Sequence, residues 1–455
     1  MALISWTATT SGSWSTGSDW SVSTGPLRGD DVAIQTTVPL TVTYGSGNLI
    51  INSLTTAVAT LSMTGGTLAV SNGYDFGGAL AISAGQLRLV GGNAGDVFAN
   101  SVTQTGGTMT LLNGAIAQGG TFTQAGGLLT VGNGSFADHD SGSFAGTIAG
   151  GGQMLFASAG STITLASGFA MTVARAEIQG GVVALNEKLS YAGAFSLDQN
   201  GVLALNGNTL TLAGKGSLGG LITSGGVLNA TGTGHLNGLI LDNGVKLDIT
   251  GSYNDNGAVT VGQSGSGTLV IDASGGNVGT LRLTNNSSIF SASGGGALVN
   301  NGLFAKVGGS STAGTSTVFT AFTNGATGIV DVAVGTLAFD GPSSGFTSTL
   351  AGTITGDGTV AFGSGNYLIS TGSSLTLDVA RLLLAGSASM TLTTNTATNL
   401  DYGGNFDMIG GTLVVGSPGL SDTTLTLAGL TALDGGADQG HRHGAVRRAR
   451  RGQSR

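Results

Sequence analysis

The densest group of side chains that could do chemistry is Asp138-His139-Asp140. Two carboxylates beside an imidazole could bind a metal ion or act as an acid and a base. Adjacent residues of an extended strand point to opposite faces, so His139 cannot share a face with both aspartates there. The segment lies between Asn133-Gly134-Ser135 and Ser141-Gly142, a setting typical of an exposed loop. We therefore expect a loop and not a site.

Other polar positions also have structural explanations. Asp30-Asp31 could suit calcium or a pair of sugar-cleaving carboxylates, but a turn after Gly29 explains both residues. His235 has no nearby acid or cysteine, so we expect it to face solvent or to pack between coils. Asp357, in Thr355-Gly356-Asp357-Gly358-Thr359, only superficially matches a calcium-binding repeat, and a turn is expected. The sequence predicts no catalytic residue, metal ligand or cofactor, and it assigns no binding residue.

An enzyme that cleaves polysaccharides is the alternative hypothesis. Such a site needs clustered carboxylates, usually with a base, on neighbouring coils of a repeat fold. The best candidates are four acids with Lys246 as the only base among them, namely Asp242, Asp248, Asp255 and Asp272. Three acids and a base converging in one groove would favour an enzyme. A groove lined by Thr, Ser and Asn would favour adhesion.

The composition predicts an all-β chain. The 455 residues include 85 glycines but only four prolines, 8% are charged, and no Gly-X-Y period is present, so collagen is excluded. Apolar residues make up 40%, which is too many for a disordered chain with so few charges. Thr and Val favour strands, and glycine at this density would melt helices. The chain has no cysteine, which is compatible with export but identifies no compartment.

Glycine pairs, or Ala-Gly, recur about every 20 residues. They stand at Gly65-Gly66, Ala84-Gly85, Gly106-Gly107 and Gly126-Gly127. An alternating strand follows each, as in Thr67-Leu68-Ala69-Val70, and glycine supplies the backbone angles that a sharp corner requires. Units this short must stack to bury their apolar faces. The pattern predicts a right-handed parallel β-helix, a β-solenoid, whose coils we cannot count because the repeats are irregular between about 140 and 400.

The first 45 residues differ from the repeats. They contain all three tryptophans, Trp6, Trp14 and Trp20. Bulky rings at the start of a solenoid suit a cap that shields the first coil, although an aromatic platform for sugars is an alternative. We expect a cap, because every open solenoid requires one.

This opening resembles the start of large bacterial secreted proteins with β-helical passengers. The resemblance lies in Trp-x7-Trp-x5-Trp, followed by Pro26 and Gly29-Asp30-Asp31-Val32. The Gly-Gly-Thr-Leu-x-Val strings, as in Gly410–Val415, are similar to the passenger repeats of autotransporter adhesins. The resemblance implies a structural or adhesive protein on a bacterial surface. An export signal and a translocating barrel, both features of that family, are not found in this sequence.

Charge is distributed unevenly. Residues 1–434 contain 22 acids and nine bases, whereas 435–455 contain six arginines and one acid, Asp438. The acidic body argues against nucleic acid as a partner. The tail breaks the repeat pattern, and the codons for Gly440–Ala445, read one base later, can spell Gly-Thr-Gly-Thr-Val. We therefore expect that the tail is a reading-frame artefact or a truncated end and that it is disordered. The alternative is an arm that binds nucleic acid or a membrane surface.

These observations predict three regions and one function. Residues 1–45 form the cap, 46–434 form the β-helix, and 435–455 form the basic tail. We expect a secreted or surface-displayed bacterial protein that is not an enzyme and has no transmembrane span. The expected partners are surface glycans or matrix components, and self-association is a further expectation.

Overall fold

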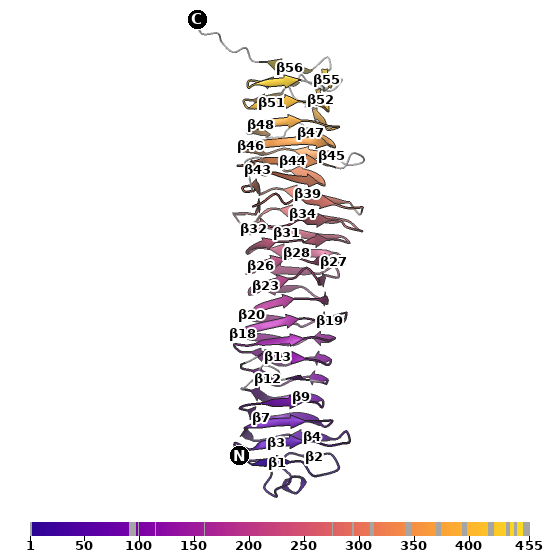
Figure 1. Ribbon diagram of the computed structural model, residues 1–455, viewed down its shortest axis with the longest axis vertical. Helices are drawn as coiled ribbons and strands as arrows, with labels where there is room; N and C mark the ends of the chain where they lie inside the picture. The colour runs from indigo at the N-terminus through magenta and orange to yellow at the C-terminus, as the bar shows by residue number, and fades with distance from the viewer. Residues whose placement is uncertain are drawn as a thin grey trace. The chain divides into compact units, whose positions relative to one another are not determined.

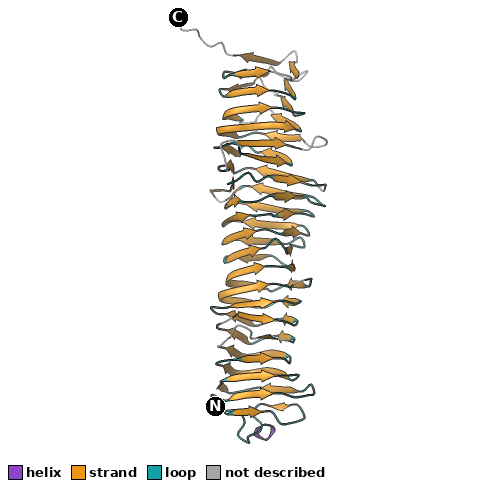
Figure 2. Cartoon of the chain, in the orientation of Figure 1, coloured by secondary structure: helices purple, strands orange, loops and turns teal. Residues whose placement is uncertain are grey.

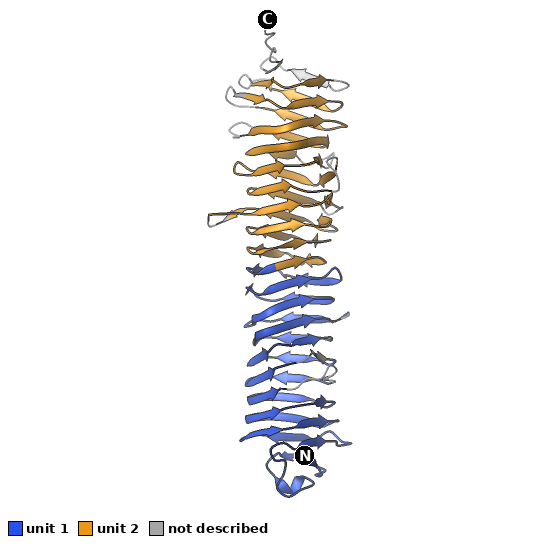
Figure 3. Ribbon diagram, turned by 60° about the vertical axis from the view of Figure 1, so that its left-hand side comes forward, with its two compact units in different colours: residues 1–215 blue, residues 216–455 orange. Residues whose placement is uncertain are grey.

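A computed structural model shows an all-β chain with 60% strand and about 16 solenoid turns in all. It describes residues 2–90, 97–98, 100–113, 115–158, 160–274, 276–293, 295–309, 314–341, 347–369, 375–393, 398–416, 423–433, 437–440 and 444–448. These residues form two compact units, 1–215 and 216–455 (Figure 3). Strands dominate both units (Figure 2), and one short 3-10 helix, η1 (Gly17–Asp19), lies in the first. Within the described part, no helix is long and apolar enough to cross a membrane.

In unit 1 the strands stack as three parallel ladders (Figure 1), because each coil contributes one strand to each face. The first ladder is β1 (Leu3–Ser5), β3 (Asp31–Ile34), β6 (Ser53–Thr56), β8 (Tyr74–Phe76), β10 (Val97–Phe98), β13 (Ala115–Gln118), β16 (Ser135–Asp138), the second halves of β18 (Thr147–Phe156) and β20 (Ala170–Ile178), and β23 (Ala194–Leu197). The second is β2 (Gly12–Ser13), β4 (Thr41–Tyr44), the first halves of β7 (Thr60–Val70) and β9 (Leu80–Leu89), β11 (Val102–Gln104), β14 (Phe122–Gln124), β17 (Gly142–Phe144), β19 (Thr162–Leu165), β21 (Gly181–Leu185) and β24 (Gly201–Ala204). The third contains β5 (Asn48–Ile51), the second halves of β7 and β9, β12 (Thr108–Leu111), β15 (Leu128–Val131) and the first halves of β18 and β20.

Stacked glycines form the corner between the second and third ladders. Gly66, Gly85, Gly107 and Gly127 have φ angles between +61° and +80°, in the left-handed region. A Cβ on Gly127 would lie 2.6 Å from the Gly106 carbonyl oxygen. The glycine pairs of the sequence therefore mark corners, where both the backbone angle and the contact with the coil below exclude a side chain.

Alternate side chains fill the interior of unit 1. Leu61, Leu80, Val102 and Phe122 occupy one register column and are at most 1% exposed. Their strand neighbours Ser62, Ala81, Thr103 and Thr123 form the matching outward column. The period-two pattern thus separates apolar interior from hydroxyl-rich surface, and apolar burial stabilises each coil only against its neighbours.

Unit 2 has the same three-ladder organisation. Its first ladder is β29 (Thr233–Leu236), β32 (Ser252–Asp255), β37 (Thr280–Leu283), β40 (Leu303–Lys306), β43 (Ile329–Val332) and the first halves of β46 (Thr353–Ser364) and β48 (Thr376–Leu384). The second is β27 (Leu221–Thr223), β30 (Ile240–Leu241), β33 (Val259–Val261), β38 (Ile289–Ser291), β41 (Thr315–Phe319), β44 (Thr336–Asp340), the second halves of β46 and β48, β51 (Asn405–Met408) and β54 (Thr431–Leu433). The third is β28 (Gly226–Ala230), β31 (Val245–Ile249), β34 (Gly267–Ile271), β39 (Gly296–Asn300), β42 (Ala321–Asn324), β45 (Thr347–Leu350), β47 (Asn366–Ile369), β49 (Ser389–Leu392), β52 (Thr412–Val415) and β55 (Ala437–Gly440).

Some polar side chains enter the interior of unit 2 and form hydrogen bonds there. Asn300 donates to the Asn324 side-chain oxygen over 2.7 Å, and both residues are fully buried. The Lys306 ammonium donates to the carbonyl oxygens of Asn285 (2.8 Å) and Gly308. These two carbonyl oxygens thus satisfy hydrogen-bond donors of the buried ammonium group.

The three tryptophans pack against one another at the start of unit 1. The Trp20 ring meets the rings of Trp6 and Trp14 edge-on, with centroids 5.0 Å apart in both pairs. The Trp20 indole N–H donates to the Trp14 carbonyl oxygen over 2.8 Å. None of the three is more than 6% exposed, so they do not present a platform to a sugar.

Part of the predicted tail follows the ladders. The backbone of β55 pairs with β52, and that of β56 (Gly444–Arg448) pairs with β53 (Thr423–Leu427). Residues 435–436, 441–443 and 449–455 lie outside the described residues. Whether the tail arises from a shifted reading frame stays a prediction.

Candidate functional site

The candidate site is an open groove of about 580 Å³ on unit 1, which we call the Arg175 groove. It is lined by Asn133, Gly134, Ser135, Gly151, Gly152, Gln153, Ala174 and Arg175. Its functional groups are amides, a hydroxyl and one guanidinium, and no carboxylate lines it. A groove of this size can hold a small ligand.

Three successive coils position the polar groups of the groove. Ser135 on β16, Gln153 on β18 and Arg175 on β20 are register partners in the first ladder. The register of β18 against β20 shifts between Gly150 and Gln153, at the corner where the third ladder passes into the first. This irregularity acts as a bulge that turns the chain, and the glycines leave the floor of the groove bare.

The two glycines of that bulge are not equivalent. A Cβ on Gly152 would lie 2.4 Å from the Gly134 carbonyl oxygen, so this position requires glycine. A Cβ on Gly151 would meet nothing nearer than 3.6 Å. Gly151 therefore leaves open a space that a larger residue could fill.

Arg175 is exposed, and within the described residues its guanidinium makes no ion pair or hydrogen bond. The nearest acid along its strand is Glu177. One oxygen of that carboxylate accepts from the Gln153 amide (2.7 Å) and the other from the Gln179 amide (2.8 Å). Glu177 is thus held by neutral donors, which leaves the Arg175 charge uncompensated by direct contact.

Unit 2 contains a second copy of the segment that forms the groove. Three strings recur in the same order, Ala145–Ile148 as Ala351–Ile354, Val173–Arg175 as Val379–Arg381, and Thr209–Gly214 as Thr424–Gly429. The register of β46 shifts between Gly356 and Thr359, as that of β18 does between Gly150 and Gln153. The same sequence therefore builds a bulged corner twice, between the third and first ladders in unit 1 and between the first and second ladders in unit 2.

The two copies of the bulged corner differ in the charged residues around the arginine. Arg381, the counterpart of Arg175, pairs with Asp407 over 2.6 Å. The position of Asp407 is occupied by Ser196 in unit 1, and that of Gly151 by Asp357 in unit 2. Unit 1 thus has an open corner with an unpaired cation, whereas unit 2 has an acidic corner with its cation neutralised. The repeated Val-Ala-Arg string is the sequence signal that could have revealed the groove.

The four acids considered for polysaccharide cleavage do not converge. Asp242 accepts three hydrogen bonds from Ser264 and Gly265, and Asp248 pairs with Lys246 over 2.8 Å. Burial opposes ionisation of Asp242, but its hydrogen bonds outweigh burial and hold its pKa below the usual range. Asp272 accepts from the backbone N–H that follows it. Asp255 is fully buried inside its coil.

The loop predicted at Asp138-His139-Asp140 is partly wrong. Asp138 ends β16 and is fully buried, because it lies two residues after the buried Phe136 and so shares its inward face. Gly142 makes room for it, since a Cβ there would lie 2.4 Å from the Asp138 Oδ2 atom. His139 is exposed, and Asp140 accepts from the Ser161 hydroxyl over 3.3 Å.

The remaining polar positions have local roles. Asp30 accepts from the Leu27 backbone N–H over 2.9 Å, as expected for a turn. Asp31 accepts from Asn52 and Ser53, each over 2.6 Å, and these bonds hold its pKa below the usual range. His235 is exposed and hydrogen-bonded to Asn256. Asp357 lies in β46, not in an isolated turn, and no cluster of three metal-binding side chains occurs among the described residues.

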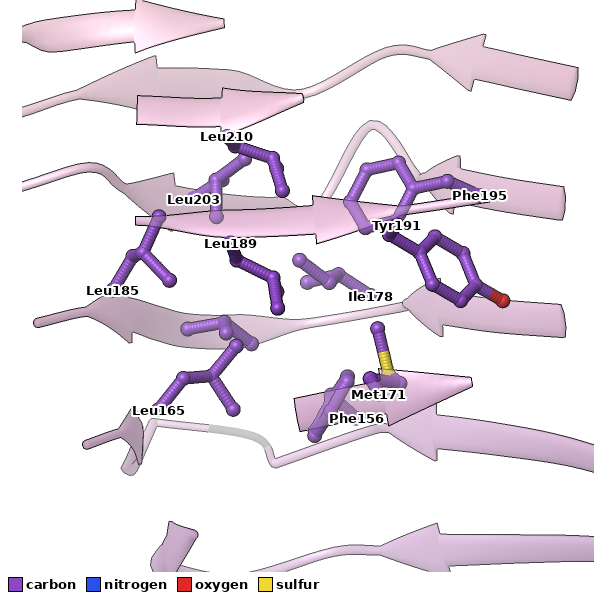
Figure 4. Close-up of a pocket in the computed structure, with 11 residues that line it drawn as sticks. Phe156, Leu165, Met171, Ile178, Leu185, Leu189, Tyr191, Phe195, Leu203 and Leu210 are labelled. Atoms are coloured by element: carbon purple, nitrogen blue, oxygen red, sulfur yellow. The ribbon is translucent and has the colours of Figure 1, made fainter. Parts of the chain in front are cut away.

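The two interior cavities that the described residues line are too small for a ligand. One cavity of about 10 Å³ lies in unit 1, and its lining includes the side chains of Phe156, Leu189 and Tyr191 (Figure 4). A corresponding cavity of about 20 Å³ in unit 2 is lined by residues such as Leu382, Tyr402 and Phe406. Both are apolar and about the size of one water molecule, so we assign them to imperfect packing.

We expect the two buried aspartates to destabilise the protein at neutral pH. Burial raises the pKa of both Asp138 and Asp255 to about 7 from the ordinary 3.8. The folded protein therefore retains protons that the unfolded chain loses between pH 4 and 7, and stability must fall as the pH rises through this window. Replacing Asp255 by Asn should recover on the order of 2 kcal/mol at pH 8, measured by urea unfolding from pH 5 to 8.

The control is Asp272→Asn, at an acid outside the coil interior, which should leave the pH dependence unchanged. Asp138→Asn tests the same effect in unit 1. Wild-type stability that is flat or rises from pH 5 to 8 would contradict the prediction.

Searches of protein-family models, curated proteins and solved structures found no match to this chain.

Proposed function

We propose that this protein is a non-enzymatic structural and adhesive β-solenoid that acts outside a bacterial cell. The observation that carries the proposal is the outward column of small polar residues, repeated from coil to coil. In unit 1 one such column contains five hydroxyl residues, interrupted once by Ala81, namely Ser62, Thr103, Thr123, Ser143 and Thr164. Parallel strands place these residues about 4.8 Å apart. Hydroxyl groups at a regular spacing can make many weak contacts with one extended partner.

The distribution of charge supports the same proposal. The acids that were grouped as a catalytic candidate have structural roles. Asp242 is hydrogen-bonded to a loop, and Asp248 forms an ion pair with Lys246. Asp255 is buried. The groove that the described residues do form contains one base and no acid, so it lacks an acid–base pair for cleaving a glycosidic bond. We infer that the partners are surface glycans or matrix components of the kind that autotransporter adhesins meet.

The proposal predicts that the hydroxyl column contributes to adhesion. Beads coated with the purified chain should adhere to glycan- or matrix-coated surfaces, and replacing Thr103, Thr123 and Thr164 together by Val should reduce adhesion at least three-fold. Valine keeps the shape of threonine but removes the hydroxyl hydrogen bonds. Bound beads are counted after washing.

The matched control replaces the same three residues by Ser, which retains the hydroxyl groups and should retain adhesion. Circular dichroism checks that both variants keep the solenoid. Coated beads that adhere no better than albumin-coated beads would refute the proposal, and equal adhesion of the Val and Ser variants would remove this column from it.

A further inference from the structure

We propose that the Arg175 groove binds an acidic sugar, a carboxylate-bearing unit of a polysaccharide, through the Arg175 guanidinium. This inference rests on the proposed adhesive function and names its ligand class. The hydroxyl columns offer no charge and little selectivity, whereas the groove combines one unpaired cation with neutral polar groups.

The guanidinium sets the charge and geometry of the ligand. Its planar N–H groups match the two oxygens of a carboxylate, a pairing that is stronger and more directional than a neutral hydrogen bond. Arg175 is exposed on β20, and no described residue pairs with it. An incoming carboxylate therefore displaces no protein partner.

The other groups of the groove favour a sugar. The Asn133 amide and the Ser135 hydroxyl can donate and accept hydrogen bonds. The Gln153 amide nitrogen is engaged by Glu177, which leaves the Gln153 carbonyl oxygen free to accept from a sugar hydroxyl. Because glycines form the floor of the groove, a sugar ring can approach the backbone closely. The groove presents no apolar pocket for a peptide side chain, and the strands beneath it are already paired on both sides.

Because the chain is acidic overall, we expect an acidic sugar to bind only at a specific cationic position. The protein carries a net charge of −8, which repels polyanions in general. A carboxylate-bearing sugar should therefore bind only where a specific cation outweighs that repulsion. Of the two copies of the corner, only that of unit 1 meets this condition, because Asp357 and Asp407 occupy the other.

The duplicated corner provides the test. Trigalacturonate, as the acidic probe, is titrated by calorimetry into the full chain and into three variants at low salt. Arg175→Gln removes the cation, and Gly151→Asp places in unit 1 the acid that unit 2 has, at a position with room for a side chain. Both should weaken binding at least ten-fold. Arg381→Gln, at the arginine already paired with Asp407, should leave binding unchanged.

The outcomes separate the inference from the function on which it rests. Neutral trigalactose should bind at least ten-fold more weakly than the acidic probe, and a tetraglutamate peptide should not compete. No heat of binding up to about 10 mM trigalacturonate, equal affinity in Arg175→Gln, or preferred binding of the peptide would each overturn the inference. If beads nevertheless adhere as proposed above, the adhesive function stands without this site. If adhesion also fails, the proposed function fails with it.

Discussion

Replacing Trp20 by Ala should destabilise the predicted cap by about 3–5 kcal/mol, the cost of truncating a buried tryptophan. The ring contacts both other tryptophans edge-on, and its N–H bonds the Trp14 carbonyl oxygen, so the change removes packing and a hydrogen bond together. All three tryptophans lie within the first 45 residues, and Trp6 and Trp14 remain as reporters. The midpoint of urea unfolding followed by tryptophan fluorescence should fall by more than that followed by circular dichroism.

A neighbouring apolar residue provides the control for this experiment. Val22 is 39% exposed in the same segment, so Val22→Ala should leave the fluorescence midpoint unchanged. Loss of the cap should also uncover strand edges and promote association, which light scattering would detect. A Trp20→Ala protein whose fluorescence midpoint equals that of the wild type would show that the cap does not depend on this ring.

The second large effect is expected at a stacked corner. Gly127→Ala should destabilise unit 1 by about 3 kcal/mol. The Gly127 φ angle of +80° is left-handed, which costs a residue with a Cβ roughly 1–2 kcal/mol. The new Cβ would also lie 2.6 Å from the Gly106 carbonyl oxygen, so the coils must move apart. Hydrogen exchange in β12 and β15, next to the corner, should rise, and the urea midpoint should fall.

A glycine with free space around it is the matched control. A Cβ on Gly73 would meet nothing within 4 Å, and its φ angle lies outside the left-handed region. Gly73→Ala should therefore be neutral or slightly stabilising, because alanine restricts the unfolded chain. Equal losses of stability in both variants would mean that glycine content, and not the corner geometry, sets the stability.

Much of the fold could be predicted because the β-solenoid repeats a local rule. In strands such as β15 (Leu128–Val131), alternation separates the inward from the outward face, and glycines such as Gly127 occur where φ is positive. The number of coils could not be predicted, because some coils contain insertions. One example is the antiparallel hairpin of β35 (Ala273–Ser274) and β36 (Asn277–Val278), which interrupts the spacing between β34 and β37.

The buried aspartates were missed because their residue type and their place in the strand pattern point to opposite faces. Alternation alone places Asp138 and Asp255 on inward faces, but an ionisable side chain is usually assigned to the surface. The groove was missed for a different reason. Its residues come from three coils, and only the register of Ser135, Gln153 and Arg175 shows that they are neighbours. The sequence itself shows Arg175 and Arg381 as equals, and the structure distinguishes them by the ion pair to Asp407.

The ladder hydrogen bonds have a mechanical consequence for each unit. They run between coils, as from the Ala145 amide to the Gln124 carbonyl oxygen, and therefore along the direction in which the coils stack. Tension applied along that direction detaches the outermost coil first, because its bonds can open one after another from the end of the chain. A coil of about 20 residues would then peel away and release roughly 65 Å of chain. A unit that yields coil by coil would act as an extensible tether, which absorbs shear without losing all of its structure at once.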